Sequence, residues 1–136
     1  MITVRGYNFS REFLGERVPQ HIQNLVIKEF CKKEKLNYLL SSTEYSMKDS
    51  SYILNQLISE LKYVDGIVAY SIFQMPYDNF ERKKIFSTII KKKKKIFFAT
   101  EGLKISNKLE MKRIEKIWLV KKVLSKCLKV DDYLNA

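Results

Sequence analysis

The residues best suited to chemistry lie close together near the start of the chain. The stretch RGYNFSREFLGERVPQHIQN, residues 5–24, holds three of the five arginines, Arg5, Arg11 and Arg17, and the only histidine, His21. Arginine presents a planar fork of N–H donors that suits bidentate binding of phosphate or carboxylate. Histidine can accept or donate a proton near neutral pH. This stretch therefore predicts a site for an anion with a proton-transfer group beside it.

The elements that must position this stretch alternate between strands and helices. Short apolar runs predict strands at residues 2–7, 37–42, 64–71 and 95–100. Apolar residues at helical spacing predict four helices: one from Val18, one that carries the apolar positions from 53 to 61, one that carries those from 80 to 90, and one from about Asn107. Such alternation is typical of a parallel sheet covered by helices. We therefore predict an α/β fold: an open, mainly parallel four-stranded sheet that allows an extra edge strand, with helices on both faces. One domain spans residues 1–136 and ends in a long helix near 107–129.

Two helix starts carry local signals. Pro19 stands where a first helical turn tolerates proline. Asp49 or Ser50 is expected to cap the second helix through its side chain.

Polar residues follow each predicted strand. In an open parallel sheet, ligands bind beyond the carboxyl ends of the strands, where the loops converge. The polar residues at these ends are Ser10, Arg11, Arg17, Gln20, His21, Gln23 and Asn24 after the first strand, Glu44 and Tyr45 after the second, Tyr70, Ser71 and Gln74 after the third, and Glu101 after the fourth. An arginine-bearing loop beside a helix N-terminus is an anion site on physical grounds. We therefore expect these side chains to surround an anionic ligand.

Three of these residues are candidates for catalysis. His21 and Glu44 suit proton transfer, and Ser10 is a candidate nucleophile. Each also has a plainer interpretation. His21 would donate to a neighbouring loop, Ser10 would be an ordinary loop hydroxyl, and Glu44, like Glu101, would pair with a loop arginine. The residue types leave these alternatives open.

The composition limits the other classes of function. The 136 residues are 46% hydrophobic and 12% aromatic, which favours a folded globular protein. Two cysteines without CxxC spacing and a single histidine predict no metal site, and we expect no cofactor. The apolar runs are too short to span a bilayer, and MITVRGYNFS lacks the unbroken apolar core of a signal peptide. We expect a cytoplasmic protein without a membrane partner.

The formal net charge of +11 and the run KKKKK at 91–95 allow two interpretations. Such a charge is found in proteins that bind nucleic acid. Alternatively, the run is the solvated end of a helix, where lysines favour the C-terminal dipole. Most lysines fall singly on predicted helix surfaces, so the second interpretation is favoured.

The order of the elements resembles the catalytic domain of serine recombinases, the resolvases. The resemblance rests on YNFS after the first strand, VDGIVAYS as the third and IFFATEGLKIS around the fourth, and it covers about residues 2–110. It implies the fold, and it places Ser10 where the family has its nucleophile. After strand three, however, the family carries an aspartate and two arginines, whereas this chain has Phe73, Gln74 and Tyr77. The resemblance therefore argues against an active recombinase.

A longer set of motifs resembles a family of small bacterial proteins that occur sporadically in carbohydrate gene clusters, among genes for nucleotide sugars and surface polysaccharides. The motifs are RGYNFSREFLGERVPQHIQN, YLLSSTEYSM, DGIVAYSIFQMP, FFATEGL and RIEKIWLV. This resemblance adds Arg5 and Tyr7 to the ligand-binding residues and implies a role in surface-carbohydrate biosynthesis. We therefore expect the chain to bind an anionic sugar derivative: a sugar phosphate, a nucleotide sugar or a sugar acid. Whether it also transforms this ligand stays open.

Two other functions remain as alternatives. The charge and the fold suit a nucleic-acid-binding relative of the serine recombinases. A non-catalytic dimeric scaffold is the second alternative, because resolvase-type domains associate through the helix that follows the sheet. The amphipathic helix at 107–129 therefore predicts a homodimer or a higher oligomer.

Overall fold

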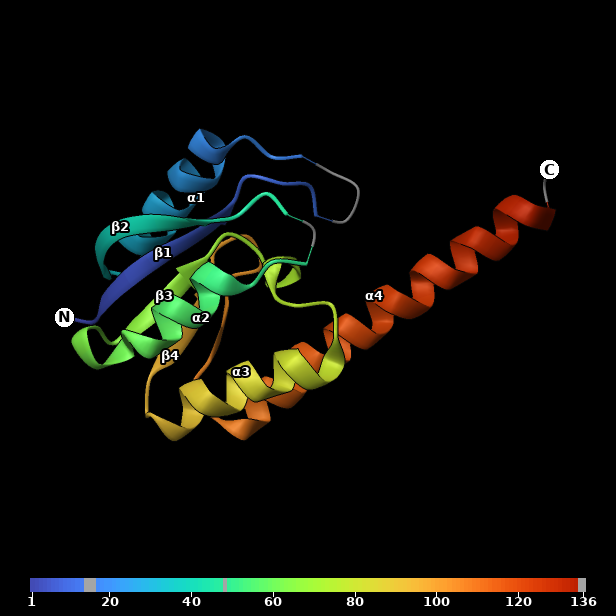
Figure 1. Ribbon diagram of the computed structural model, residues 1–136. Coiled ribbons are helices and arrows are strands. Elements are labelled where there is room, and N and C mark those ends of the chain that lie inside the picture. Colours follow the sequence, from blue (N-terminus) through green and yellow to red (C-terminus); the bar gives the residue numbers. More distant parts are fainter. Residues whose placement is uncertain (14–16, 48, 135–136) are drawn as a thin grey trace.

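A computed structural model of the chain describes residues 1–13, 17–47 and 49–134 (Figure 1). The elements are β1 (Thr3–Phe9), α1 (Gln20–Lys33), β2 (Asn37–Glu44), α2 (Tyr52–Ser59), β3 (Gly66–Ala69), α3 (Asn79–Lys91), β4 (Lys95–Phe98), β5 (Leu103–Ile105) and α4 (Lys108–Leu134). Two short 3₁₀ turns, η1 (Leu61–Tyr63) and η2 (Ile72–Gln74), lie on either side of β3. The predicted alternation of strands and helices is confirmed.

The strands form one sheet in the order β2-β1-β3-β4-β5. The first four are parallel, and β5 pairs antiparallel with β4 at the edge. The predicted α/β fold is therefore correct, and β5 is the extra edge strand that it allowed. Because β1 connects to β2 on one side and the chain then continues to β3 on the other, the strand order reverses between β1 and β3.

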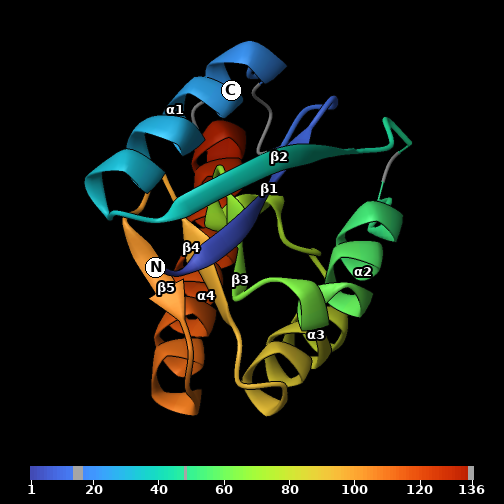
Figure 2. The same cartoon turned by 90° about the vertical axis from the view of Figure 1, so that its left-hand side faces the viewer.

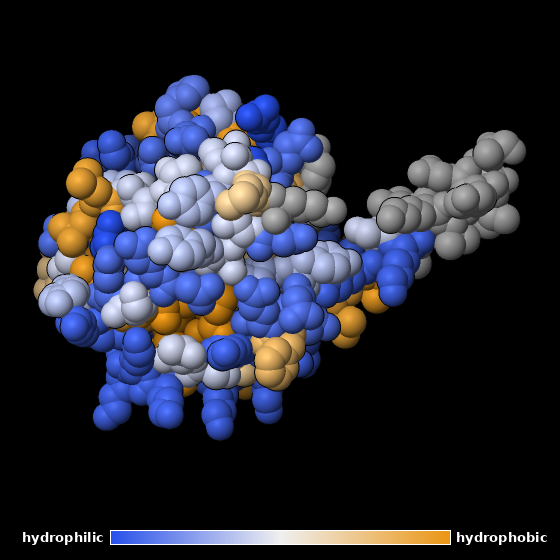
Figure 3. All heavy atoms as spheres, in the orientation of Figure 1, coloured by the Kyte–Doolittle hydropathy of each residue, from blue (hydrophilic) through white to orange (hydrophobic). Residues whose placement is uncertain are grey.

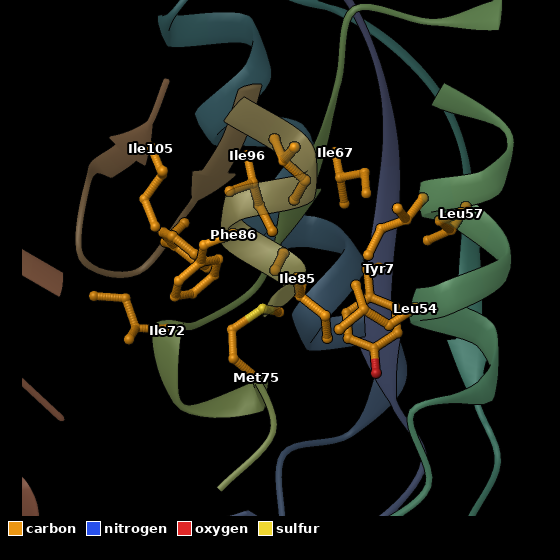
Figure 4. Packing of buried hydrophobic residues seen from close by; sticks show 14 of the residues in the cluster. Tyr7, Leu54, Leu57, Ile67, Ile72, Met75, Ile85, Phe86, Ile96 and Ile105 are labelled. Carbon is orange, nitrogen blue, oxygen red and sulfur yellow. The ribbon is translucent and has the colours of Figure 1, made fainter. Parts of the chain in front are cut away.

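Helices cover both faces of the sheet, as predicted (Figure 2). On one face, α1 packs on a small cluster that includes Val4, Ile27, Cys31 and Val68. On the other face, α2, α3 and α4 pack on a larger cluster, part of which appears in Figure 4. All four residues of β3 are buried, as expected for a central strand covered on both sides.

Gly66 allows the central strands to approach closely. A Cβ at this position would lie 2.4 Å from the carbonyl oxygen of Lys95 in β4. Strand packing therefore requires a glycine as the first residue of β3. Asp65 adds a tie to β1, because its Oδ2 accepts a hydrogen bond from the backbone N–H of Thr3 at 2.8 Å.

The helix starts differ from the predictions. Helix α1 begins at Gln20, so Pro19 is its N-cap and lies outside the first turn. Helix α2 follows Ser51, whose side chain makes no capping hydrogen bond. The predicted capping by Asp49 or Ser50 is wrong, because the carboxylate of Glu44 accepts the hydrogen bonds from Ile53 and Leu54 at this helix end. The prediction considered only residues next to the helix, whereas the capping residue, Glu44, is the last residue of the preceding strand.

Helix α4 extends to Leu134, beyond the predicted end at about residue 129, and projects away from the sheet (Figure 1). Among the described residues, no helix is long and apolar enough to cross a membrane. The basic run at 91–95 starts at the last residue of α3 and passes through a turn into β4, so only Lys91 of the run belongs to the helix. Hydrophilic side chains project at the bottom of Figure 3, where α3 lies, and Lys83, Lys84 and Lys91 of this helix are exposed.

Candidate functional site

A pocket of about 1040 Å³ lies beyond the carboxyl ends of β1 and β3, where the strand order reverses. This is where ligands bind in open α/β sheets. The walls come from the loop after β1, the loop between β2 and α2, the segment from η2 into α3, and one residue of α4. The lining residues are Phe9, Ser10, Arg11, Glu12, Phe13, Arg17, Ser46, Asp49, Ser50, Ser51, Phe73, Gln74, Met75, Pro76, Tyr77, Asp78, Glu81 and Trp118.

Four of the residues predicted for the site line this pocket: Ser10, Arg11, Arg17 and Gln74. Arg17 is exposed and makes no hydrogen bond or ion pair to another described residue. The hydroxyl of Ser10 donates to the backbone carbonyl of Glu44 at 3.1 Å. Within the described residues, no side chain is hydrogen-bonded to Ser10 as a base.

Arg11 holds the loop between β2 and α2. Its guanidinium donates to the carbonyl oxygens of Tyr45, Met47 and Ser50 at 2.9, 3.1 and 2.9 Å. It also lies 4.1 Å over the ring of Phe9. These partners are neutral, so the positive charge of Arg11 stays uncompensated by any of them. Arg11 therefore shapes the pocket wall and contributes positive potential to it.

The first turn of α1 follows the arginine-bearing loop but does not line the pocket. Its N-cap, Pro19, makes no side-chain hydrogen bond, and the turn contains no acidic residue. Free N–H groups and the helix dipole favour an anion at such an end. Gln20 and His21 are exposed in this turn, and neither lines the pocket.

A buried pair of glutamines joins two of the pocket loops. Gln23 Oε1 accepts from the backbone N–H of Phe9 at 2.9 Å, and its Nε2 donates to the carbonyls of Phe9 and Val18. Gln74 donates to Gln23 Oε1 at 2.7 Å, while its own oxygen accepts from the N–H of Tyr70. The end of β1 and the end of β3 are thus fixed relative to one another.

Glu44 is only 1% exposed, at the end of β2. Its two oxygens accept from five donor groups: the hydroxyls of Tyr7 and Ser50 and the backbone N–H groups of Tyr45, Ile53 and Leu54. Burial, followed by the charge of Glu44, raises the pKa of Tyr7 well above its ordinary value. The Tyr7 hydroxyl therefore stays protonated and donates to the carboxylate at 2.9 Å.

Glu101 has a similar role at the end of β4. Its oxygens accept from the hydroxyl of Ser71 at 2.9 Å and from the N–H of Ile72 at 2.7 Å. Ser71 in turn caps η2, forming a capping box with Gln74. The expectation that Glu44 and Glu101 pair with loop arginines is therefore wrong, since both carboxylates cap backbone N–H groups.

The other predicted residues bind elsewhere in the fold. Arg5 donates to Glu60 at 2.5 Å and to Ser42 at 3.0 Å, partway along β1. Three residues contact neighbouring loops and strands: Asn24 accepts from the side chain of Asn8, Tyr45 stacks near Tyr52, and Tyr70 contacts the ring of Phe13. None of them lines the pocket.

Sequence reasoning missed the wall formed by Tyr77, Asp78, Glu81 and Trp118. Trp118 comes from the last helix, and its only sequence signal was an apolar position at helical spacing. Asp78 and Glu81 belong to the start of α3, where acidic residues are expected for helix capping alone.

Within residues 1–13, 17–47 and 49–134, no group of three His, Cys, Asp or Glu side chains is placed to hold a metal ion. Burial raises the pKa of the Cys31 thiol to about 11, so this cysteine is protonated at neutral pH. It belongs to α1 and packs against the face of the sheet opposite α2 and α3.

Comparison with known proteins identifies the fold. No protein-family model matches the sequence, and no curated protein matches it significantly. A resolvase-family site-specific recombinase from Streptococcus pneumoniae has a similar structure, with a TM-score of 0.60, 9% sequence identity and 97% of each chain covered. The N-terminal catalytic domain of TP901-1 integrase gives a TM-score of 0.56 at 12% identity, covering 91% of this chain and 98% of that domain. The chain therefore has a resolvase-like α/β fold, and at these identities the similarity concerns the fold alone.

Proposed function

We propose that the pocket binds an anionic sugar derivative and that Arg17 holds its phosphate or carboxylate group. The observation that carries this proposal is an exposed arginine, without a described partner, on the wall of a pocket at the switch point of the sheet. Arg11, whose hydrogen-bond acceptors are neutral backbone carbonyls, adds positive potential on the same loop. These groups favour a ligand that carries negative charge at one end.

The size and lining of the pocket favour a sugar derivative over a bare anion. A volume of about 1040 Å³ suits a ligand as large as a nucleotide sugar. Serine hydroxyls and carboxylates on the same walls can hydrogen-bond to sugar hydroxyls. The resemblance to proteins of carbohydrate gene clusters supports the same ligand class and a role in bacterial surface-carbohydrate biosynthesis.

Binding is better supported than catalysis. Glu44 uses both carboxylate oxygens on buried donors, and His21 lies outside the pocket lining. We also propose that the chain is not an active recombinase. Phe73, Gln74 and Tyr77 cannot stabilise a scissile phosphate as the two arginines of that family do, because these three side chains carry no charge.

Arg17→Gln is expected to weaken binding of a sugar phosphate or nucleotide sugar by about 10- to 100-fold, since a hydrogen bond to a charged group contributes about 1.5–3 kcal/mol. Trp118 is the only tryptophan and lines the pocket, so its fluorescence can follow a titration that calorimetry confirms. The ligand panel contains sugar phosphates, nucleotide sugars and sugar acids.

Arg113→Gln is the matched control. Arg113 is an exposed arginine that lines a separate hollow of about 310 Å³, which shares no residue with the main pocket. Its replacement is expected to leave binding unchanged. Absence of binding to the whole panel at millimolar concentration, or equal losses in the two variants, would contradict the proposal.

We further propose that α4 mediates self-association. Leu119, Val120, Val123 and Leu124 are largely exposed where this helix leaves the sheet, and Figure 3 shows hydrophobic atoms along this part of it. Light scattering at tens of micromolar is expected to give at least a dimeric mass, and Val123→Glu is expected to reduce it towards that of a monomer. Leu40→Glu, at an 82% exposed leucine on β2, should leave the mass unchanged. A monomeric wild-type protein would refute this proposal.

A further inference from the structure

Tyr77 is an exposed aromatic residue whose ring is nevertheless held in place. It is 64% exposed and lines the pocket between η2 and α3. Its ring meets Trp118 edge to face at 6.0 Å between centroids, and the Nζ of Lys122 lies 4.1 Å from the ring centroid. A large exposed ring that is fixed before binding loses little entropy when a ligand covers it.

The backbone under this ring is fixed as well. The carbonyl oxygen of Tyr77 accepts from Lys122 at 2.9 Å and from Arg82 at 3.1 Å. Trp118 is held in turn by Phe73, at 5.2 Å between ring centroids, and by the guanidinium of Arg82, 4.3 Å from its own ring. These ties to the Tyr77 backbone do not depend on the Tyr77 side chain, so the ring can be removed while they stay in place.

Two carboxylates stand beside this ring on the same pocket wall. Asp78 Oδ2 accepts from the N–H of Glu81 at 2.9 Å, which leaves Oδ1 without a partner among the described residues. Glu81 Oε1 accepts from the hydroxyl of Ser51 at 2.7 Å. Carboxylate oxygens accept strong hydrogen bonds from hydroxyl groups, whereas they repel a phosphate.

The pocket therefore has two unlike walls. The loop after β1 presents Arg11 and Arg17 together with Glu12, and the segment that leads into α3 presents Tyr77 with Asp78 and Glu81. An anionic group is favoured on the first wall and disfavoured on the second. An uncharged ring with C–H groups on its face and hydroxyls on its rim fits the second wall, because the aromatic ring covers the C–H face and the carboxylate accepts from the hydroxyls.

We infer that Tyr77 is the platform for the sugar ring of the ligand and that Asp78 accepts from a ring hydroxyl. This inference rests on the proposed binding of an anionic sugar derivative and assigns each end of that ligand to one wall. Tyr77 then determines preference for a ring-bearing ligand, whereas Arg17 determines affinity for the anion.

The test uses two pairs of probes, each without and with the sugar: inorganic phosphate with glucose 1-phosphate, and UDP with UDP-glucose. Wild-type protein is expected to bind the sugar-bearing member of at least one pair more tightly. Tyr77→Ala is expected to weaken binding of that member about tenfold, in line with aromatic contacts, and to leave the sugar-free member unchanged. Tyr77→Phe should retain the preference, because the ring alone is required.

Two further variants sharpen the assignment. Asp78→Asn keeps a good N-cap for α3 and is expected to weaken only the sugar-bearing probe, by several-fold. Tyr63→Ala is the matched control. Tyr63 is 75% exposed, and the Nζ of Lys62 lies 5.0 Å from its ring centroid, much as Lys122 lies near Tyr77. Tyr63 does not line the pocket. It should change no affinity, and thermal melting should show both alanine variants folded.

The outcomes separate the two proposals. If the probes bind and depend on Arg17, but Tyr77→Ala weakens both members of a pair equally or neither, the platform is refuted and the anion site stands. If wild-type protein shows no preference for the sugar-bearing member of either pair, the platform is likewise refuted. If no probe binds at all, the proposed function fails and the platform fails with it.

Discussion

Replacing Glu44 by alanine is expected to lower the free energy of unfolding by about 3–5 kcal/mol. The carboxylate is buried and accepts from five donor groups, two of them N–H groups in the first turn of α2. Hydrogen bonds to a charged group contribute about 1.5–3 kcal/mol, and buried donors left without an acceptor add their own cost. The effect should therefore exceed that of an ordinary helix cap, which is about 1 kcal/mol.

Urea unfolding followed by Trp118 fluorescence measures this change. Glu29→Ala, which removes an exposed glutamate from α1, is the control and should stay within about 0.5 kcal/mol of wild type. Glu44→Gln keeps the shape of the side chain and one acceptor oxygen. Its loss in the free energy of unfolding is expected to lie between those of Glu29→Ala and Glu44→Ala. A loss below about 1 kcal/mol for Glu44→Ala would show that the network does not stabilise the fold as its geometry implies.

The fold was predictable because its strong signals are local. Each parallel strand is a short apolar run and each helix shows its own periodicity, so the order of elements fixes the topology. Strand β5 has only three residues, one of them exposed, and such a segment carries no clear pattern. The direction in which α4 projects depends on contacts of Trp118 and Glu115 with α3 and its preceding loop, and periodicity does not report these.

The sequence predicted where the candidate site lies, but not which polar side chains face the pocket. The strand order places the loop residues at one edge of the sheet, and a pocket lies there. A sequence does not show whether a polar side chain faces a cavity or binds its own backbone. Gln23 and Glu44 are polar residues of types that often bind ligands. In the structure, however, their side chains make buried hydrogen bonds that fix the loops.

The pocket wall that carries Tyr77 is held by a buried ion pair whose residues lie far in sequence from the arginine-rich stretch at 5–24. Arg82 is 1% exposed and binds Glu115 through two hydrogen bonds of 2.6 and 2.8 Å. Its remaining donors reach the carbonyls of Pro76 and Tyr77 and the side chain of Asn79. One residue thus joins α3, α4 and the loop that forms the pocket wall.

Arg82→Met is expected to lower the free energy of unfolding by about 3–5 kcal/mol, because it leaves the carboxylate of Glu115 without its partner. It should also change the fluorescence of Trp118, since the guanidinium lies 4.3 Å from that ring. Urea unfolding measures the first effect and emission spectra of the folded protein the second. Arg113→Met, at an exposed arginine on α4, is the control and should leave both near wild type.

The double variant Arg82→Met with Glu115→Leu separates the pair from the carbonyl contacts. Replacing both members of a buried ion pair by apolar residues is often neutral, whereas removing one is costly. The double variant should therefore lose less stability than the sum of the two single losses. The stability that it still loses measures the hydrogen bonds from Arg82 to the carbonyls of Pro76 and Tyr77. Strict additivity would mean that the two charges act independently. The double variant is also expected to bind the sugar-bearing probe less tightly, because the backbone beneath Tyr77 has lost one of its two side-chain donors.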